Sequence, residues 1–239
     1  MRATAKRSAD PTPRPWRPFV WLATKWREFR QEFHYRHGRS ARNVTRRNTR
    51  RAYEKLYAAD DLLAEYLVPE RLAFYEEVAA IAAPFAGRSV VDIGCGDGNL
   101  LRALLDNVAR RGNSIERVLA IDYARSALVR VGEVVPEAEQ RVMDFLRGNL
   151  GGERFDLVLC TEVLEHMPQP EVARERLVQA CTANGTIVIT VPDGAVDVWE
   201  GHVNFWTEDQ IRVFLAPAGE TTVRRIDGGS GLLAIVRPQ

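Results

Sequence analysis

The sequence predicts an α/β fold in which helices flank a mostly parallel β-sheet. Three observations predict it. A glycine-rich turn joins an apolar run to a helical pattern within residues 90–104, and apolar runs then alternate with helical patterns up to residue 191. Near the carboxyl terminus, two adjacent glycines separate two short β-type runs, which is typical of a hairpin. Strands that alternate with helices build a parallel sheet, because each crossover helix returns the chain to the same end of the sheet.

The glycine-rich turn is the most informative segment. The apolar run ends in Asp92, and Gly94, Gly96 and Gly98 follow at every second position, with Cys95 after the first glycine. Glycine adopts positive φ readily and lets the backbone approach a ligand at a helix amino terminus. The spacing differs from the GxGxxG fingerprint of dinucleotide-binding proteins. We expect a ligand site here; the alternative is a glycine-rich turn of an unrelated α/β protein.

Two later apolar runs also lead into acids. Asp122 closes one run and precedes Tyr123, while Asp144 follows the next run and precedes Phe145. A carboxylate at the end of the second strand can accept hydrogen bonds from both hydroxyls of a ribose. Tyr123 and Phe145 would then pack against a nucleobase. The alternative for either acid is a surface residue that begins a turn.

The segment 155–168, FDLVLCTEVLEHMP, and the apolar run 185–192 complete the pattern. With the glycine turn and the two acids, they resemble the class I methyltransferases that use S-adenosylmethionine (SAM). The resemblance is to the small-molecule type, which includes enzymes that O-methylate ubiquinone precursors, and it covers about residues 71–239. It implies SAM as the cofactor and a Rossmann-like, seven-stranded, mostly parallel sheet that ends in an antiparallel hairpin.

The resemblance also assigns the cofactor contacts. An acid after the third strand often contacts the adenine amino group in this family, and Asp144 matches it by type and position. The cofactor-binding residues that we expect are Asp92, Gly94, Cys95, Gly96, Gly98, Asp122, Tyr123, Asp144, Phe145 and Thr161.

Periodicity places the individual elements. Strands are expected near 89–93, 118–122, 140–143, 156–160 and 185–191. Helices are expected near 98–110, 125–133 and 170–182, and the hairpin strands near 221–226 and 232–236. Apolar residues at helical spacing between Ala52 and Ala83 predict two further helices, separated near Pro69. In the resembled family such helices cap the cofactor, so Tyr53, Tyr57 and Tyr66 either line the acceptor pocket or are ordinary core residues.

Charge is unevenly distributed along the 239 residues, although the net charge is only +1. The first 51 residues hold 15 of the 33 Lys and Arg but three of the 32 Asp and Glu. We therefore divide the chain into a disordered tail at 1–15, a basic amphipathic arm at 16–51, a helical cap at 52–84 and a SAM-binding catalytic domain at 85–239.

The basic arm carries two patterns. Aromatic and apolar residues recur at helical spacing from Trp16 to Phe33, and residues 39–51 contain six arginines and no acid. The helix would lie on an anionic membrane surface, or pack on the catalytic domain or on a homodimer partner. The arginines form a solvated face, or contact phosphate in RNA, in a phospholipid or in a nucleotide-linked sugar.

The composition of the chain limits the cellular compartments in which we expect the protein. No apolar run reaches 18 residues, and the amino terminus lacks the apolar core of a secretory signal. The three cysteines Cys95, Cys160 and Cys181 are an odd number, which argues against a disulfide framework and for a reducing compartment. We expect a cytoplasmic protein that either is fully soluble or associates peripherally with a membrane surface.

Candidate catalytic groups stand after the fourth and fifth strands. Methyl transfer from a sulfonium needs a positioned acceptor and, for a hydroxyl, removal of a proton. We expect His166 to be the general base, because the unperturbed pKa of histidine lies near 6.5. His202 is the second candidate base, and Glu162 is the third catalytic candidate. The alternative for His166 is a residue that only braces the turn above Pro168.

A metal site is a second interpretation of the same residues. The pattern Glu162-x-x-Glu165-His166 resembles the divalent-metal motif of some ubiquinone-pathway O-methyltransferases. It also resembles the motif of enzymes that methylate the 2′-hydroxyl at RNA 3′ ends, in which a later histidine, here His202, completes the site. The spacing around His202 departs from that of the RNA enzymes, so our first expectation is that no metal is bound.

These observations predict an enzyme that transfers a methyl group from SAM to an oxygen or nitrogen atom of a small molecule. The acceptor would be a specialised metabolite, a sugar or a quinone-like precursor. The rivals are a metal-dependent RNA 3′-end 2′-O-methyltransferase and a non-catalytic SAM-binding partner protein. The segment 192–206 is expected to be a substrate lid, whose acids Asp193, Asp197 and Glu200 either attract a cationic amine or are solvated.

Overall fold

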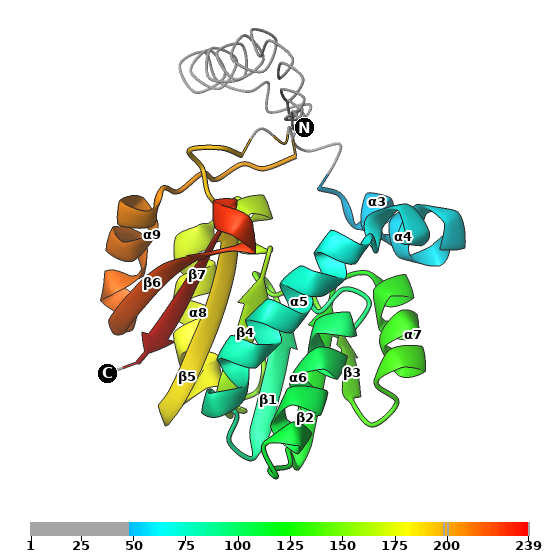
Figure 1. Ribbon diagram of the computed structural model, residues 1–239, viewed down its shortest axis with the longest axis horizontal. Coiled ribbons are helices and arrows are strands. Elements are labelled where there is room, and N and C mark those ends of the chain that lie inside the picture. The colour runs from blue at the N-terminus through cyan, green and yellow to red at the C-terminus, as the bar shows by residue number, and fades with distance from the viewer. Residues whose placement is uncertain (1–47, 198, 200, 239) are drawn as a thin grey trace, which may run out of the picture. The chain divides into compact units, whose positions relative to one another are not determined.

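The computed structural model describes residues 48–197, 199 and 201–238, and of residues 65 and 66 it describes the backbone alone. Seven strands form one sheet in the order β3-β2-β1-β4-β5-β7-β6 (Figure 1). The first five strands are parallel, and β7 runs antiparallel to both β5 and β6. The strands are β1 (Ser89–Ile93), β2 (Arg117–Asp122), β3 (Glu139–Val142), β4 (Phe155–Thr161), β5 (Cys181–Pro192), β6 (Glu220–Ile226) and β7 (Gly231–Arg237). The predicted fold class is therefore confirmed.

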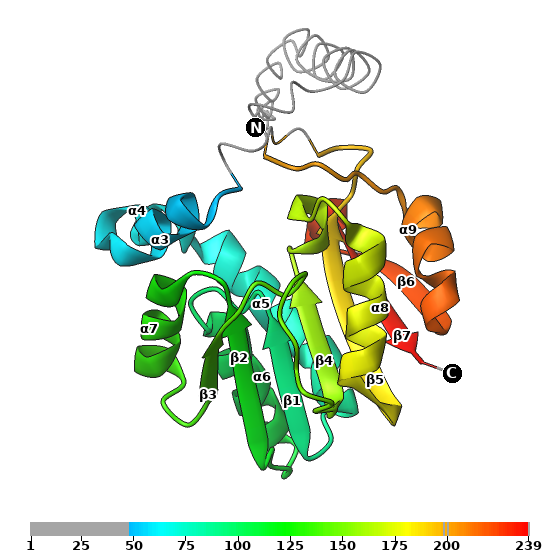
Figure 2. The same ribbon diagram turned by 180° about the vertical axis from the view of Figure 1, so that it is seen from behind.

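Helices cover both faces of this sheet. In Figure 1, α5 and α6 lie in front of the strands, and Figure 2 shows α8 on the opposite face. The α-helices are α3 (Arg50–Ala58), α4 (Asp60–Tyr66), α5 (Pro69–Ala82), α6 (Asn99–Arg110), α7 (Arg125–Val134), α8 (Pro170–Ala180) and α9 (Glu208–Leu215). Short 3₁₀ turns are η1 (Ala83–Phe85), η2 (Leu164–His166), η3 (Ala216–Ala218) and η4 (Asp227–Gly229).

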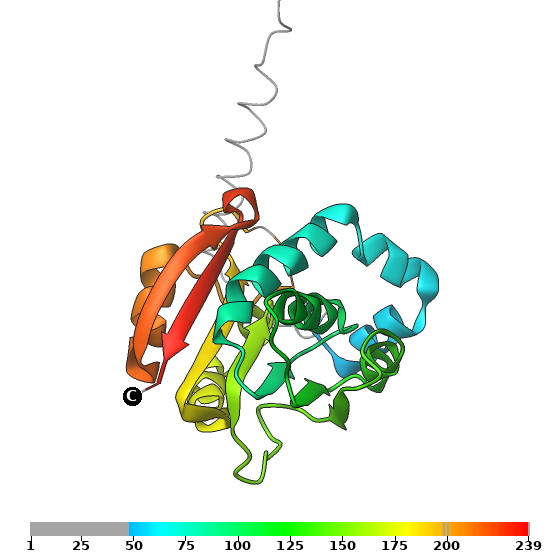
Figure 3. The ribbon, with the colours of Figure 1, turned by 60° about the horizontal axis from the view of Figure 1, so that its bottom comes forward.

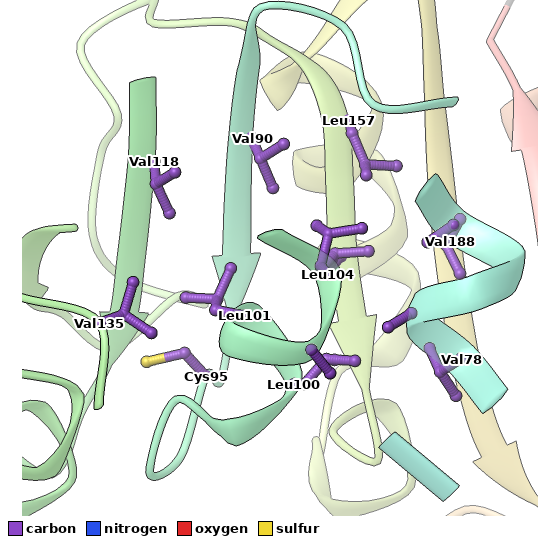
Figure 4. Packing of buried hydrophobic residues seen from close by; sticks show 14 of the residues in the cluster. Val78, Val90, Cys95, Leu100, Leu101, Leu104, Val118, Val135, Leu157 and Val188 are labelled. Carbon is purple, nitrogen blue, oxygen red and sulfur yellow. The ribbon is translucent and has the colours of Figure 1, made fainter. Parts of the chain in front are cut away.

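Alternate residues of the central strands feed two apolar layers. Val90, Val118 and Leu157 point to the face covered by α6, where they meet Leu101 and Leu104 (Figure 4). The intervening residues, such as those at 91, 119 and 158, pack on the face covered by α8 and α9. Parallel strands are buried on both faces, which explains why their sequences read as continuous apolar runs. The two layers fix the strands and thereby the positions of their carboxyl ends.

The structure differs from the expected elements in four respects. The helix expected at 170–182 ends at Ala180, because Cys181 already pairs with Phe155 and β5 starts there. The pairing of β4 with β5 then shifts register before Thr186, so the strand is longer than the expected 185–191. The residues before Pro69 form two helices, since Ala59 is extended and the acids at 60 and 61 begin a new helix.

Helix α9 is the fourth difference, because no helix was expected between the lid and the hairpin. Thr207 caps it: the Thr207 hydroxyl accepts from the Gln210 amide, and the Gln210 side chain accepts from the Thr207 amide. This reciprocal capping box is a recognisable sequence signal, Thr-x-x-Gln before apolar residues. The hairpin that follows α9 is formed as predicted, with the glycine pair in its turn.

The carboxylate of Glu54 attaches the helical cap, formed by α3, α4 and α5, to the α/β domain. Glu54 of α3 accepts hydrogen bonds from the backbone amides of Arg125 and Ser126, both at 2.9 Å, and so caps the amino terminus of α7. Arg130 of α7 donates back to the Tyr57 carbonyl at 3.0 Å. Figure 3 shows α3 beside α7, with α4 linking α3 to α5. Polar contacts with α7 therefore help to hold α3 over one end of the sheet.

The predicted tail at 1–15 and most of the predicted arm at 16–51 lie outside the described residues. Arg50 and Arg51, the last arginines of the arm, form the first turn of α3. The arm's anionic partner, its dimer partner and the domain boundaries stay predictions. Among the described residues, no helix has both the length and the apolar character that a membrane span requires.

Replacing Glu54 with alanine should lower the free energy of unfolding by about 1 kcal/mol at pH 7, as loss of a helix cap does. Hydrogen bonds from the Ser126 and Arg125 amides lower the pKa of Glu54 from 4.5 to about 2. The contribution of Glu54 is therefore complete above pH 4.5 and is lost as the pH falls through about 2.

Urea unfolding of both proteins at pH 7 and at pH 3 measures this effect. The difference between them should shrink at the lower pH. The matched control is Glu116→Ala, whose carboxylate pairs with the exposed Arg88. If Glu54→Ala lowers the free energy of unfolding no more than Glu116→Ala does, the hydrogen bonds from Glu54 to the amino terminus of α7 contribute nothing to stability.

Candidate active site

One cleft opens at the carboxyl ends of β1, β2 and β4. Its volume is about 1320 Å³, and residues from Asn48 to His202 line it. Small-molecule sites commonly measure roughly 300–1,000 Å³, so this cleft has room for two ligands. Most residues that the sequence singles out line it: Asp92, Gly94, Cys95, Gly96, Asp122, Tyr123, Asp144, Phe145, Thr161, Glu162, Glu165, His166 and His202. Gly98 is not among the lining residues.

The glycine turn forms the floor of one half of the cleft. Gly96 has φ +55°, and a Cβ atom there would lie 2.8 Å from the Tyr57 hydroxyl of the cap. Gly98, at φ +86°, is the N-cap of α6, and a Cβ atom there would meet Val131 of α7 at 3.2 Å. Gly96 therefore keeps the cleft open beneath Tyr57, while Gly98 serves helix packing.

Asp92 is buried at the end of β1 without a hydrogen-bond partner. Both of its carboxylate oxygens are inaccessible and unpaired among the described residues, and the same is true of the Thr161 hydroxyl at the end of β4. Burial, with smaller effects of Asp122 and Asp97, raises the pKa of Asp92 to about 7. Buried polar atoms normally have partners, so Asp92 and Thr161 are candidates for contact with a ligand.

Asp122 is held by the turn that it faces. Its carboxylate accepts from the Gly96 amide at 3.2 Å and from the Ala124 amide at 2.8 Å. Burial raises the pKa of Asp122 to about 6, against these hydrogen bonds, which favour the ionised form. Beside it, the rings of Tyr123 and Tyr53 lie 5.6 Å apart between their centroids. An acid and an aromatic wall therefore stand together at the end of β2.

Asp144 and Phe145 follow β3 and form the outer side of this half. Asp144 accepts from the Leu146 amide at 3.0 Å, and Arg147 lies 3.6 Å from its other oxygen. Phe145 is buried in the layer beneath α8 and also lines the cleft. Cys95 lines the same cleft and packs in the apolar layer with α6, and burial raises the pKa of its thiol well above the usual range, so the thiol is neutral.

The other half of the cleft holds two histidines and a glutamate. The Glu165 Oε1 atom lies 3.8 Å from His166 Nε2 and 4.0 Å from His202 Nε2. One potential ligand atom from each of the three residues lies within 4.8 Å of the other two. Ligand atoms about 2 Å from a shared ion lie at most ~4 Å apart, so the cluster is slightly wider than an ion-bound site.

Contacts between the lid and η2 bring His202 to this place. The Asn204 side chain donates to the carbonyls of Leu164 at 2.8 Å and Met167 at 2.7 Å. The Asn204 amide donates to the Glu165 carbonyl at 3.1 Å. Residues about 40 positions apart in the sequence therefore form one rigid corner. Asn48, just before α3, adds a hydrogen bond to the Gly201 carbonyl.

Asp197 orients the His202 ring. Its carboxylate is hydrogen-bonded to His202 Nδ1, which leaves Nε2 facing Glu165. A carboxylate on one imidazole nitrogen fixes the tautomer in which the other nitrogen offers its lone pair, as is common for metal-binding histidines. Trp199 stacks edge-on against His202 with centroids 4.7 Å apart.

Burial controls the protonation of the cluster. It raises the pKa of Glu165 well above the usual range, with a further increase from Glu162, and neither Glu165 oxygen has a hydrogen-bond partner among the described residues. Burial also lowers the pKa of His166 to about 3, with a smaller effect of His202, so its imidazole is neutral near pH 7. The cluster therefore combines a carboxyl group whose burial favours its protonated form with the neutral ring of His166.

Glu162 stands at the end of β4 in an unusual conformation. It has φ +56°, which is costly for a residue with a side chain and is commonly found at functional sites. Its side chain accepts from the Thr190 hydroxyl at 3.1 Å. Glu162 thus lines the cleft but is anchored to β5, and it is not part of the three-residue cluster.

The lid acids are engaged within the protein. Asp193 is buried, pairs with Arg225 of β6 and does not line the cleft, and Asp197 is bonded to His202. Glu200 lies outside the described residues. Nothing in this arrangement favours a cationic amine, which was one expectation for the lid.

Two lining residues of α5 were not singled out in the sequence. Arg71 and Tyr75 share a helical face with the buried Val78, Ala79 and Ala82. An arginine in register with the apolar positions of a helix is the signal that would have found Arg71. Of the cap tyrosines, Tyr53 and Tyr57 line the cleft.

A family model described as "Methyltransferase domain" matches residues 63–223, about two thirds of the chain. The chain belongs to this family. The resemblance inferred from the sequence motifs is thereby confirmed. The match spans β1 to β5, which carry every strand-end acid of the cleft.

Relatives of this methyltransferase include the mitochondrial ubiquinone biosynthesis O-methyltransferase of Schizosaccharomyces pombe, 32% identical over 50% of this chain and 43% of that protein. The corresponding protein of Ralstonia nicotianae is 37% identical over 41% of this chain and 39% of its own. Each match spans less than half of the relative. The fold resembles that of the plantazolicin methyltransferase BpumL in complex with SAH, with a TM-score of 0.59, 12% identity, and 82% and 98% of the two chains covered.

Replacing Gly96 with alanine should destabilise the protein through both strain and a clash with the Tyr57 hydroxyl. Gly151→Ala is the matched control, because Gly151 has φ +65° and open space around its Cα atom. In urea unfolding, we expect Gly151→Ala to lower the free energy of unfolding by about 1–2 kcal/mol through backbone strain alone. Gly96→Ala should lower it by more.

The double variant Gly96→Ala/Tyr57→Phe checks the cause. Without the hydroxyl, the nearest remaining Tyr57 atom lies 3.5 Å from the new Cβ atom, an ordinary contact. The additional loss of stability that Gly96→Ala shows over Gly151→Ala should then largely disappear. If it persists, the cap does not lie against the glycine turn.

Proposed function

We propose that this methyltransferase moves a methyl group from SAM to a hydroxyl oxygen of a small molecule. One observation carries the proposal. A single cleft joins the unpaired Asp92 at the glycine turn to the cluster of Glu165, His166 and His202. The names of the curated relatives and the SAH complex of a protein with this fold support the same reaction class.

The half of the cleft around the glycine turn fits SAM. The unpaired Asp92 carboxylate would accept from the ammonium of the methionine part, which would return its pKa to the ionised range. Asp122 would accept from the ribose hydroxyls, and Tyr123 would lie against the adenine. SAM would supply an electrophilic methyl carbon to the acceptor oxygen, its sulfur would keep the electrons of the broken carbon–sulfur bond, and the hydroxyl proton would leave to solvent.

The other half fits a divalent cation. Glu165 offers two unpaired oxygens, His166 is neutral, and His202 presents an oriented nitrogen lone pair. Such a cation would act as a Lewis acid that lowers the pKa of the acceptor hydroxyl. His166 with a pKa near 3 is a weak base at neutral pH, so a ligand role suits it better than the general-base role. Glu162 would complete the ligand set if its side chain left Thr190.

Two alternatives share this site. A metal-dependent RNA 3′-end 2′-O-methyltransferase would use the same cluster of Glu165, His166 and His202. The rings of Tyr53 and Trp199 beside His166 give the site aromatic walls that suit a planar acceptor. A non-catalytic SAM-binding partner protein would need only the half around Asp92 and Asp122.

Asp122→Ala should weaken the binding of S-adenosylhomocysteine at least about tenfold, or about 1.4 kcal/mol, because the ribose hydroxyls lose their acceptor. Isothermal titration calorimetry measures the change. Asp106→Ala serves as the control, since Asp106 pairs with Arg102 on the surface of α6. Equal affinities of the two variants would remove Asp122 from the cofactor site.

Glu165→Gln should reduce methyl transfer at least about a hundredfold, because an amide cannot supply a charged ligand or balance a cation. Transfer from labelled SAM to a catechol and to a short RNA is measured with and without a chelator, and Mn²⁺ binding is measured by calorimetry. Glu171→Gln, an exposed change on α8, is the control.

Label in the catechol that the chelator abolishes is the expected result. Label in RNA alone would favour the second candidate function. Transfer that the chelator leaves unchanged would exclude the cation and return His166 to the role of base.

A further inference from the structure

The two ends of the lid meet at one buried carboxylate outside the cleft. Asp193 is 1% exposed, and its Oδ2 atom is bonded to the guanidinium of Arg225 in β6. The Asp193 Oδ1 atom accepts from the Ala195 amide at 3.0 Å. From the other end of the lid, Trp206 forms a β-bridge with Asp193, and the Trp206 carbonyl accepts from the Gly194 amide at 2.8 Å. The lid is therefore fastened at both ends beside the Asp193 side chain.

Arg225 joins this point to two further elements. Strand β7 lies between β5 and β6, so the guanidinium reaches across the end of β7 to meet Asp193 (Figure 1). Its Nη1 atom also donates to the Gly229 carbonyl at 3.3 Å, and its Nε atom lies 3.5 Å from Glu208 Oε2 in the first turn of α9. The Asp193 amide donates to the Ser230 carbonyl at 2.8 Å. Because a guanidinium offers donors in fixed directions, one side chain holds the lid to the hairpin turn and to α9.

Asp193 is connected to His202 through Asp197. The Asp193 carbonyl accepts from the Asp197 amide at 2.8 Å. One oxygen of the Asp197 carboxylate accepts from the Trp199 amide at 3.0 Å, and the other is bonded to His202 Nδ1. The opposite ring nitrogen, Nε2, then lies 4.0 Å from Glu165. A continuous series of contacts thus runs from an ion pair outside the cleft to the nitrogen that faces the cluster.

We propose that Asp193 and Arg225 are positioning residues, whose ion pair holds Asp197 against His202 Nδ1 and so fixes the orientation and the tautomer of the His202 ring. Neither Asp193 nor Arg225 lines the cleft, so both act through Asp197. The role is the same whether His202 binds a cation or serves as a base, since each function needs the lone pair on Nε2.

The tautomer of His202 tests this inference directly. The chain has four histidines, so histidine labelled with ¹⁵N gives few signals, and those missing from His202→Gln belong to His202. Long-range ¹H–¹⁵N NMR spectra distinguish a ring with its proton on Nδ1 from one with its proton on Nε2. The wild-type ring should carry its proton on Nδ1. Arg225→Gln should shift the ratio of the two tautomers toward Nε2 at least about fivefold. Arg225→Lys should recover part of the Nδ1 form, because it keeps the charge without the planar fork.

Arg224→Gln is the matched control, because Arg224 is the neighbouring exposed residue of β6 and its side chain points to the opposite side of the strand. It should leave the His202 signals unchanged. The Arg225 side chain is 48% exposed, so its replacement by glutamine leaves no buried cavity. Calorimetry with S-adenosylhomocysteine checks that the Arg225→Gln protein is folded, and its affinity should change less than about twofold.

A purely structural ion pair would give a different result. Arg225→Gln would then lower the free energy of unfolding in urea and leave the His202 tautomer as in the wild-type protein, which would overturn the proposal. A wild-type ring that populates both tautomers equally would overturn it as well. Because the spectra are recorded with a chelator and without SAM, they need neither a cation nor turnover, and the outcome is independent of the proposed reaction.

A second pair of variants checks the path. Asp197→Ala removes the contact to His202 Nδ1 directly. Adding Arg225→Gln to Asp197→Ala should change the tautomer ratio no further, because the two side chains act in series. A further shift in the double variant would show that Arg225 reaches His202 by another route and would contradict the proposed role.

Discussion

Buried acids that the fold does not neutralise are the constraint on which this structure depends. Asp92 lies near the end of β1 and Glu165 follows β4, and the apolar residues of these strands must be buried for the sheet to form, so the two carboxyl groups are buried with them. Neither has a hydrogen-bond partner among the described residues. Burial of an ionised group is unfavourable, and both groups respond by a raised pKa. The sheet is therefore stable enough to hold two buried carboxyl groups whose preferred partners would come from outside the chain. Ligands that supply a positive charge there would stabilise the folded state in proportion to their affinity.

Sequence reasoning predicted the parts of the molecule that local patterns determine. The apolar runs that end in Asp92, Asp122 and Thr161 are strands, and their carboxyl ends meet in one cleft, because parallel strands place those ends at one edge of the sheet. The grouping of Glu165 and His166 with His202 belonged to the metal interpretation that the resemblance implied, and the structure places these three side chains together.

Contacts that depend on packing between distant segments were not predictable in the same way. The hydrogen bond between Asp197 and His202 depends on the path of the lid, and Asp193 turned away to Arg225 although it directly follows β5. The place of Arg71 depends on how α5 rotates against the sheet, which a helical period indicates only as a buried face. The capping role of Glu54 required knowledge that α3 lies beside α7. In each case the residue type was visible, but the partner was set by tertiary structure.

The hydrogen bond from Asn48 to the Gly201 carbonyl joins the chain before α3 to the lid. Through α3, the same segment carries Tyr57, which lies over the glycine turn. The lid in turn carries His202 to the half of the cleft that holds Glu165 and His166. A displacement of α3 would therefore open both halves of the cleft together, the half proposed for SAM and the half proposed for the methyl acceptor. The two ligands would then exchange through one shared gate, so the release of one product would be kinetically linked to the release of the other.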